Sequence, residues 1–514
     1  MSKRQIVNII NFIRDIEPRL EMDLMTPVLE QIKLLKQYNL KGTFMLQYDS
    51  LIDTAYTDIL KELDPTQFEI GVWFETVQPL VEKAGAVWKG RYPWDWHSYC
   101  GFSVGYTRTE RKNMIDILFN DFKAIFGYYP KSFGSWAFDT YTLDYANETY
   151  GLDAACNCKE QWGTDGYTMW GGYYGQGYYP SKKNVFAPSQ TAENQITTPV
   201  FRMLGSDPIY QYDCGLDINA GLAAFQGVIT LEPVYTGKSG GGGVNSWVDW
   251  YLKENFNGKC LSFGYTQAGQ ENSFGWKAMK NGLTYQIEQI AEMKSNGLLE
   301  VETLGETGRW YKNEYETTPP STITALNDWK DTNKKSIWYS SKNYRANLYS
   351  ENNELWIRDI HMFKDAYIER YIEDICTTNE MIYDNLPIID GNRFSGNGIR
   401  SGIWFEYNGS KINFDELIYD EFDNNAVITC KTSVCGDIKI TFTDDSMKIQ
   451  SDKEITLKPY YDSRISQWLD VTDVTANEIG FIYNNFKYRI EITNGIINDD
   501  FSVICEDTVI NFKI

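Results

Sequence analysis

The sequence predicts an α/β protein in which a (β/α) barrel, either regular or distorted to seven strands, precedes an antiparallel β-sandwich domain. Strand-like and helix-like stretches alternate up to about residue 310, and only short alternating strands follow. Between the two patterns, the segment ETTPPS (316–321) places two prolines between Thr and Ser, which is typical of a linker. We therefore predict a catalytic barrel over residues 1–315 and a β-sandwich over residues 322–514.

Strands and helices of the first part are predicted from hydrophobic periodicity. β-rich runs predict strands at 6–12, 42–48, 68–75, 130–139, 152–160, 199–207, 227–235, 259–267 and 298–304. Apolar residues at helical spacing predict helices at 25–40, 56–63, 109–127 and 281–297. Gly127 and Gly297 are typical C-terminal stops for the last two helices. Alternation over this length favours parallel strands, and eight or nine of them favour a barrel.

The second part carries a different pattern. Turn signals such as Asn352-Asn353, Asn408-Gly409 and Asn494-Gly495 recur between short alternating strands, which predicts an antiparallel β-sandwich. The segment 356–371 mixes charged and aromatic residues, as a buried domain interface does. We expect this domain to pack on the barrel.

Charge and composition exclude several kinds of partner. With 48 Lys and Arg against 70 Asp and Glu, the formal net charge is −22, which repels a phosphate backbone and argues against nucleic acid as a partner. No run of apolar residues is long enough to span a membrane, and the N-terminal segment is too polar for a signal peptide. The nine cysteines lack metal spacing and suggest reduced, buried thiols, so we expect a cytoplasmic protein.

The chain contains only two histidines, His97 and His361. Sites built on two or three clustered imidazoles are therefore excluded unless these two meet. We predict no catalytic metal and no cofactor.

Carboxylates dominate the predicted carboxyl ends of the barrel strands, where barrel enzymes place their functional side chains. The residues at these ends are Arg14, Asp15, Asp49, Glu75, Asp139, Glu160, Asp207, Glu232 and Glu271. Paired carboxylates are what cleavage of a glycosidic bond requires, one as proton donor and one as nucleophile or base. The alternative to a catalytic role is a structural one, in which each of these carboxylates caps a helix or forms an ion pair.

Aromatic residues form 15% of the chain and cluster in segments 73–106 and 162–179, which we expect in loops after barrel strands. Flat aromatic faces beside polar groups suit the C–H faces of sugar rings. The alternative is a long loop that packs on its own aromatic side chains.

Three stretches resemble the NodB-like polysaccharide deacetylases: GTFMLQYD (42–49), FEIGVWFE (68–75) and FGSWAFDT (133–140). Family 57 and family 38 glycoside hydrolases share the same distorted barrel followed by a β domain, and the resemblance covers roughly residues 5–305. The deacetylases hold a metal through an Asp pair on the first strand and two histidines on the third. Here the first strand reads NFIRD and the histidine position holds Trp73-Phe74-Glu75, so the metal site is not carried over.

The resemblance to family 57 implies a nucleophilic carboxylate at the end of the fourth strand and an acid on a late strand. Asp139 matches the first position, and Glu232 or Glu271 could match the second. We predict a metal-independent glycoside hydrolase acting on oligosaccharides, with Asp139 as nucleophile or base and Glu232 as general acid. Glu271 is the closest alternative acid. Long aromatic loops over the barrel mouth suggest a pocket and exo-action.

The remaining candidate residues are expected to bind the sugar. Glu75 and Asp207 would bind hydroxyls or tune the acid–base pair. The expected substrate contacts are Arg14, Trp73, Trp136 and Gln267. Two alternatives remain: a divergent carbohydrate deacetylase whose metal is held by carboxylates and His97, and a non-catalytic sugar-binding protein.

Overall fold

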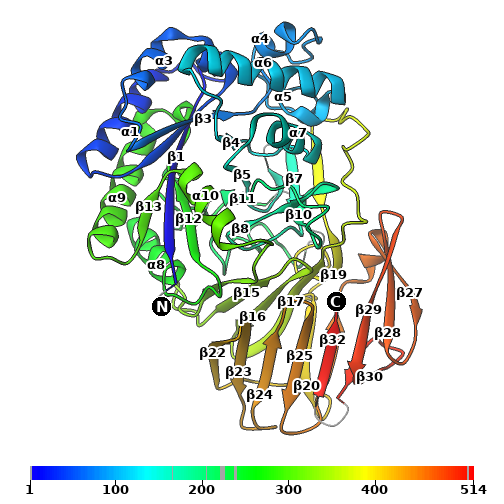
Figure 1. Ribbon diagram of the computed structural model, residues 1–514. Helices are drawn as coiled ribbons and strands as arrows, with labels where there is room; N and C mark the ends of the chain where they lie inside the picture. Colours follow the sequence, from blue (N-terminus) through cyan, green and yellow to red (C-terminus); the bar gives the residue numbers. More distant parts are fainter. Residues whose placement is uncertain (1–2, 165, 204, 220–225, 237–239, 506–508) are drawn as a thin grey trace.

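Parallel strands of the N-terminal part form one curled sheet with helices along its outer side (Figure 1). The computed structural model describes residues 3–164, 166–203, 205–219, 226–236, 240–505 and 509–514. The strand order is β12-β1-β2-β3-β4-β5-β11. These strands are β1 (Gln5–Ile13), β2 (Gly42–Leu46), β3 (Phe68–Trp73), β4 (Ser132–Gly134), β5 (Ala154–Cys158), β11 (Val200–Met203) and β12 (Gly264–Ala268).

The sheet curls without closing into a complete barrel. β13 (Glu300–Glu302) pairs in parallel with β1, and β8 (Gly177–Tyr178) pairs antiparallel with β11. Among the described residues no backbone ladder joins β11 to β12, although the rings of Phe201 and Tyr265 pack with their centroids 5.2 Å apart. The predicted α/β class is therefore confirmed, whereas a complete barrel is not.

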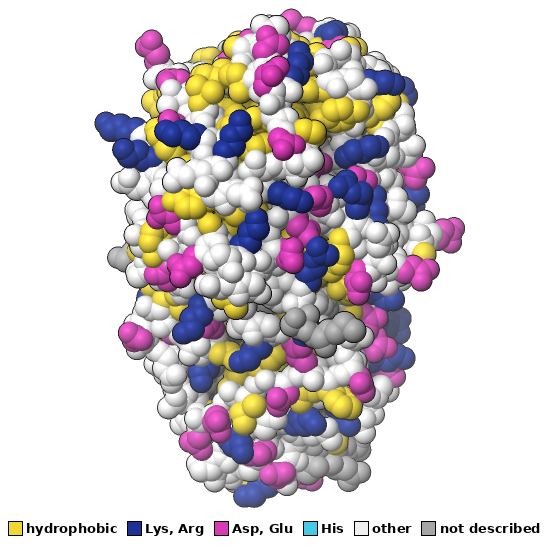
Figure 2. Space-filling model, turned by 60° about the vertical axis from the view of Figure 1, so that its left-hand side comes forward, with side chains coloured by type: hydrophobic (Ala, Val, Ile, Leu, Met, Phe, Trp, Pro, Cys, Tyr) yellow, Lys and Arg dark blue, Asp and Glu magenta, His cyan; other side chains and the backbone are white. Residues whose placement is uncertain are grey.

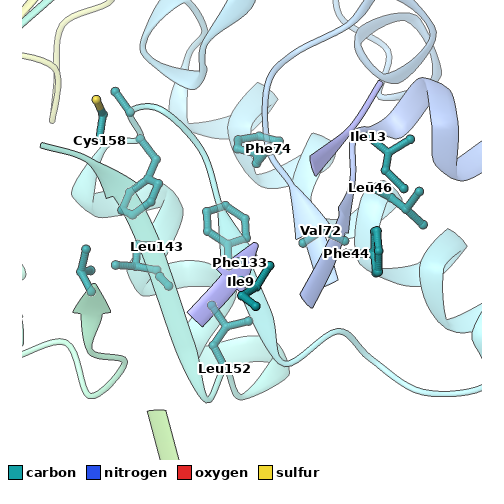
Figure 3. Packing of buried hydrophobic residues seen from close by; sticks show 14 of the residues in the cluster. Ile9, Ile13, Phe44, Leu46, Val72, Phe74, Phe133, Leu143, Leu152 and Cys158 are labelled. Carbon is teal, nitrogen blue, oxygen red and sulfur yellow. The ribbon is translucent and has the colours of Figure 1, made fainter. Parts of the chain in front are cut away.

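Helices cover the outer face of this sheet because its strands are apolar on both sides. The helices are α1 (Met25–Gln37), α2 (Tyr48–Ile52), α3 (Thr54–Lys61), α4 (Gln78–Lys83), α5 (Ser98–Gly101), α6 (Arg108–Phe126), α7 (Thr140–Tyr150), α8 (Asn245–Asn255), α9 (Trp276–Ser295) and α10 (Leu304–Glu314). Figure 3 shows part of the outer core, to which Ile9, Phe44, Val72 and Phe133 contribute one side of their strands. Alternate residues of β1 face the inner cluster instead, as expected for a parallel sheet buried on both faces.

Several predicted elements differ from the structure. The run 227–235 is not a strand, and Thr230 forms only an isolated bridge with Ser206. Loop and side-chain groups satisfy its backbone instead, since the Gln286 amide donates to the carbonyl oxygens of Leu231 and Gly242. Residue 204, within the predicted strand 199–207, lies outside the described residues. Helices α7, α8 and α10 and the short strands β6 (Gln161–Thr164) and β7 (Tyr167–Trp170) were not predicted.

The C-terminal part consists of antiparallel strands in two large sheets that share one hydrophobic cluster. The first runs β14-β15-β16-β17-β20-β26-β31-β30, with β19 on β17 and β21 on β20. Its strands are β14 (Ser321–Ala325), β15 (Lys335–Ser340), β16 (Tyr344–Glu351), β17 (Glu354–Met362), β19 (Leu386–Asp390), β20 (Gly402–Tyr407), β21 (Ser410–Lys411), β26 (Thr456–Tyr460), β30 (Ile496–Ile497) and β31 (Val503–Ile504).

The second sheet runs β22-β23-β24-β25-β32-β29-β28-β27. Its strands are β22 (Glu416–Phe422), β23 (Asn425–Lys431), β24 (Ile438–Phe442), β25 (Ser446–Ser451), β27 (Leu469–Val474), β28 (Glu478–Tyr483), β29 (Phe486–Asn494) and β32 (Val509–Lys513). The turn signals lie where the sequence places them: Asn352, Asn353, Asn408 and Gly409 have positive φ between paired strands.

The two parts of the chain are interleaved. β18 (Met381–Asp384), from the C-terminal part, pairs in parallel with β7, which in turn pairs with β6. Shortly after β7 in the sequence, β9 (Pro180–Ser181) and β10 (Asn184–Pro188) form a two-stranded antiparallel ribbon. At the predicted linker, the Thr318 hydroxyl accepts a hydrogen bond from the backbone N–H of Tyr179. The C-terminal part therefore completes a small sheet within the N-terminal part.

The surface carries charged side chains of both signs. Figure 2 shows Lys and Arg interspersed with Asp and Glu over one face, with hydrophobic side chains gathered toward its upper end. The excess negative charge is thus not concentrated in one patch on that face. Within the described ranges, we find no helix with the length and hydrophobicity that a membrane span requires.

Candidate active site

A cavity of about 410 Å³ opens beyond the carboxyl ends of β1, β3 and β12. Each of these strands is followed closely by a charged residue that lines the cavity: Arg14, Glu75 and Glu271. Its other charged residues are Glu17, Arg19 and Glu232, and its aromatic walls are Trp94, Trp96, Phe102, Trp136, Tyr167, Tyr235 and Phe274. The strand ends thus place carboxylates and aromatic rings around one space, as the sequence predicts for a barrel mouth.

Arg14 lies at the centre of the charged groups and is 1% exposed. Its Nη2 donates to Oε2 of Glu75 at 3.4 Å and to Oε2 of Glu271 at 3.2 Å. The guanidinium carbon lies 4.0 Å from the centroid of the Trp94 ring, a distance typical of a cation–π contact. One buried cation therefore holds two carboxylates from different strands.

Neighbouring amides fix the backbone and side chains of this cluster. The Asn272 side chain accepts from the backbone N–H of Arg14 and donates to its carbonyl oxygen, at 3.0 and 2.8 Å. Gln47, which follows β2, donates to Oε2 of Glu75 at 3.1 Å, and the indole N–H of Trp94 donates to the same oxygen at 2.9 Å. Donors from three residues thus converge on one oxygen of Glu75, which suits an ionised carboxylate because it only accepts.

Glu271 has a different environment. Its Oε1 accepts a hydrogen bond from the Ser273 hydroxyl, and its Oε2 faces Arg14. Burial raises the pKa of Glu271, and the negative charge of Glu75 acts in the same direction, while Arg14 opposes them. The surroundings of Glu271 therefore raise its pKa above that of an exposed carboxyl group.

Glu232 and Trp136 also line the cavity, as the sequence predicts for both. Glu232 is buried and follows the bridge at Thr230 rather than a full strand. Trp136 follows β4 and packs edge-on against Trp73 and Phe12. Trp73 itself is fully buried, stacked on Phe12 inside the sheet, and is not among the described residues that line the cavity.

Asp139, the predicted nucleophile or base, is placed differently. It is fully buried at the N-terminus of α7, where it accepts from the backbone N–H and the hydroxyl of Thr142 at 2.9 and 2.7 Å. It also forms an ion pair with Arg111 of α6 at 3.0 Å. Asp139 is not among the described residues that line the cavity, so it does not share that space with Glu232. This geometry favours a structural role, because its oxygens are already used.

Asp207 and Gln267 also lie away from the cavity-lining residues. Asp207 accepts from the backbone N–H groups of Ile209 and Tyr210 and from the indole N–H groups of Trp247 and Trp329. It therefore ties the N-terminal part to Trp329 of the C-terminal part. Gln267 lies on β12 opposite Asn8 of β1, and it is not among the described residues around the cavity.

The other strand-end carboxylates are structural. Asp49 accepts from the backbone N–H groups of Asp15 and Ile16 at 2.9 Å and thereby fixes the loop that follows Arg14. Burial raises its pKa to about 7. Glu160 forms an ion pair with Arg345 of β16. Asp49 and Glu160 thus have structural roles, as an acceptor of backbone hydrogen bonds and as an ion-pair partner, in line with the alternative to catalysis that the sequence left open.

Aromatic residues of the predicted loop 73–106 form one wall of the cavity mouth. The Arg19 guanidinium lies over the rings of Trp94 and Trp96, at 4.9 and 5.4 Å from their centroids, and also donates to Glu17 at the rim. In contrast, most aromatic residues of 162–179 pack inside the protein, and Tyr167 is the member of that segment among the described lining residues. The described aromatic residues of these two segments that line the cavity thus come mainly from the first segment.

The donor set does not fit the metal that the resemblance to the deacetylases implies. Among the described cavity-lining residues there is no histidine, and the carboxylates of Glu75 and Glu271 face the Arg14 guanidinium. Within the described ranges, the one triad with metal-ligand spacing is Asp359, His361 and Asp390. It is fully buried elsewhere, and Arg345 and Arg393 already pair with its carboxylates at 2.8 and 2.6 Å.

No family model and no curated protein matches this chain. Among solved structures, it is similar to a candidate glycoside hydrolase/deacetylase from Parabacteroides distasonis. That likeness has a TM-score of 0.55 and 15% identity, and it covers 75% of this chain and 91% of the other. A candidate polysaccharide deacetylase from Mycobacterium smegmatis matches with a TM-score of 0.36 and 12% identity, over 61% and 92% of the two chains.

A GH57 branching enzyme from Thermococcus kodakaraensis matches with a TM-score of 0.30 and 11% identity, over 61% of this chain and 72% of the other. The solved structures that resemble this chain thus include polysaccharide deacetylases and a GH57 enzyme. The likeness to the Parabacteroides distasonis structure shows a shared fold, as the predicted resemblance implies.

Proposed function

We propose that this protein is a carbohydrate-active enzyme, and specifically a metal-independent glycoside hydrolase acting on oligosaccharides. One observation carries the proposal: Arg14 holds the carboxyl groups of Glu75 and Glu271 on a single nitrogen, within an aromatic-walled cavity. Two carboxyl groups in unlike surroundings are what the acid and the nucleophile of a glycosidase need.

The environments assign the roles. Glu271, whose pKa burial raises, donates a proton to the glycosidic oxygen as the leaving group departs. Glu75, which accepts from Gln47, Trp94 and Arg14, attacks the anomeric carbon as a carboxylate. Glu271, now ionised, then takes a proton from the water that releases the sugar from Glu75.

The spacing of the two carboxyl groups is compatible with a retaining outcome. Both Oε2 atoms contact the same nitrogen, at 3.4 and 3.2 Å, so they cannot lie further apart than these two distances end to end. This upper limit reaches only the lower end of the about 6.5–9.5 Å that separates the two carboxyl groups in inverting enzymes. The separation of about 5–5.5 Å in retaining enzymes falls below the limit. The pair Glu75–Glu271 therefore replaces the pair Asp139–Glu232, and Glu232 becomes a further carboxylate of the substrate cavity.

The test is hydrolysis of a panel of aryl glycosides by the wild type and by Glu75→Gln and Glu271→Gln variants. Each variant should lose at least about 10²-fold in kcat, the scale typical of one positioned acid or base, without a lower melting temperature. Glu21→Gln is the matched control, because Glu21 is exposed on the loop after Arg14 and is not among the described cavity-lining residues. Full activity in both variants would contradict the proposal.

A carbohydrate deacetylase is the second candidate, because the Parabacteroides distasonis structure that shares this fold is described as a candidate glycoside hydrolase/deacetylase. The same proteins should therefore be assayed for acetate release from acetylated oligosaccharides, with and without a chelator. Acetate release that a chelator abolishes, together with no cleavage of glycosides, would favour the deacetylase over the glycosidase.

A further inference from the structure

A second hollow adjoins the cavity of the proposed active site. It has a volume of about 730 Å³, and Met22 and Phe274 line both spaces. Asp23, Thr26, Trp276 and Lys277 lie along the remainder of the second hollow. The two spaces therefore adjoin at Met22 and at Phe274, which lies three residues after Glu271.

The backbone of this segment directs two aromatic rings into the second hollow. A short 3₁₀ turn, Asn272–Phe274, is followed by Gly275, and α9 begins at Trp276. Gly275 has a φ of 74°, in the left-handed region that favours glycine, and so the chain turns sharply between Phe274 and Trp276. A Cβ at Gly275 would lie 3.9 Å from Cε of Met22, which places Met22 across the junction of the two spaces.

The second hollow combines aromatic rings with polar side chains, among them Lys277 and Lys280. Phe274 and Trp276 are half-buried, so part of each ring remains open to a ligand. The Asp23 carboxylate is already used, since it accepts from the backbone N–H groups of Met25 and Thr26 at 3.0 Å. Half-exposed aromatic rings beside polar side chains bind the C–H faces of pyranose rings.

We propose that the second hollow is an additional glycan-binding subsite, in which Trp276 stacks on a sugar unit that lies beyond the bond cleaved at Glu75 and Glu271. The inference rests on the proposed function and extends it: the substrate is an oligosaccharide chain that runs from the first cavity past Met22 into the second. This arrangement differs from the pocket for exo-action that the aromatic loops suggest, because a chain can extend through it.

The experiment measures binding and cleavage separately. Binding of cello-, xylo-, manno- and malto-oligosaccharides, each as disaccharide and hexasaccharide, is measured by calorimetry on Glu271→Gln protein with and without Trp276→Ala. Loss of Trp276 should weaken hexasaccharide binding by about tenfold, the scale of one aromatic contact, and leave disaccharide binding within about twofold. Tyr128→Ala is the matched control, because Tyr128 is an exposed aromatic residue before β4, at the opposite end of the sheet.

The outcomes separate this inference from the proposed function. The subsite is overturned if Trp276→Ala weakens the binding of disaccharide and hexasaccharide equally, or if it weakens the binding of neither. This holds even where the wild type cleaves glycosides. Binding of none of the four series also overturns it. If the hexasaccharide alone is affected but the wild type cleaves no glycoside, the subsite stands and the proposed hydrolase activity falls.

Discussion

Arg14 is the residue on which the geometry of the site depends. It stands directly after β1, and its single Nη2 contacts both carboxylates of the proposed pair. Among the described residues, its Nε and Nη1 have no hydrogen-bond partner, although Oε2 of Glu17 lies 3.9 Å from Nη1. Arg14 therefore positions the two carboxylates through one nitrogen, while its Nε and Nη1 are buried.

Replacing this cation should change the pH dependence of activity. The charge of Arg14 lowers the pKa of Glu271, so Arg14→Met should move the basic limb of the kcat/KM profile to higher pH, because that limb reports the proton donor. Arg14→Lys keeps a positive charge and should move the limb less. A kcat/KM profile of both variants on one aryl glycoside checks this, and a limb that stays or moves to lower pH in Arg14→Met would contradict it.

Several residues of the site carry no sequence signal. Gln47 and Asn272 are neutral amides without a motif, and their importance becomes visible only when the fold brings them to Glu75 and Arg14. Glu75 and Glu271 were predictable as strand-end carboxylates, because parallel strands direct their carboxyl ends to one edge. The preference for Glu75 and Glu271 over Asp139 as catalytic residues was not predictable, since nothing in the sequence shows that Arg111 pairs with Asp139.

At the scale of elements, α6 and α7 show why Asp139 was misleading. Asp139 ends the fourth-strand segment, as a nucleophile would, but it also begins α7 as its N-cap, and Arg111 of α6 pairs with the same oxygen, Oδ1, that accepts the capping hydrogen bond. The same position in a sequence pattern therefore suits two roles. The structure decides between them through the hydrogen bonds that the carboxylate already makes.

Asp139→Asn should accordingly reduce stability rather than catalysis. Removing the charge leaves Arg111 buried without its partner, which typically costs about 3–5 kcal/mol, whereas kcat of the folded fraction should change by less than about threefold. Asp53→Asn is the matched control, because Asp53 caps α3 near the surface and Asn caps a helix about as well as Asp, so stability should hardly change. Urea unfolding with parallel activity assays distinguishes the two, and an unchanged midpoint with a 10²-fold loss of kcat would restore the catalytic assignment.

Other elements follow from the sequence to different degrees. β1 and α6 were predictable because their periodicity is strong and Gly127 ends α6 in the left-handed conformation with a φ of 86°. The run 227–235 has the composition of a strand but is not one, because Gly242 and Gln286 satisfy its backbone in place of a neighbouring strand. Composition therefore predicts burial there, but not the partner.

At the scale of the whole molecule, buried charges join the two parts of the chain. Glu369, from the segment before β18, accepts from the backbone N–H groups of Thr140 and Val185, both at 2.9 Å. Arg111 donates to the carbonyl oxygen of Tyr371 at 2.8 Å. Burial and the nearby Asp139 raise the pKa of Glu369 to about 8.

This shift predicts how stability depends on pH. A carboxyl group whose pKa is higher in the folded state holds its proton there while the unfolded chain loses it, so the free energy of unfolding falls as pH rises from about 4.5 to about 8. Glu369→Gln should remove this contribution, whose slope is at most about 1.4 kcal/mol per pH unit. Asp49, with a pKa raised to about 7, contributes a decline of the same sign that persists in the variant. Urea unfolding across this range measures both proteins, and parallel curves would contradict the prediction.

The pairing of β7 with β18 has a consequence for the order in which the protein is made. The Thr168 hydroxyl donates to the Glu380 carboxylate across a separation of 212 residues in sequence. At about 5–20 residues per second, a ribosome needs on the order of ten seconds or more to add the later strand once the earlier one has emerged. Tyr167, which begins β7, lines the proposed substrate cavity. This part of the cavity wall therefore cannot pair with β18 until β18 has been synthesised. The cavity is therefore completed only after β18 has been synthesised, and a nascent chain that ends between Glu271 and β18 carries the two carboxylates before it carries a complete cavity for the sugar.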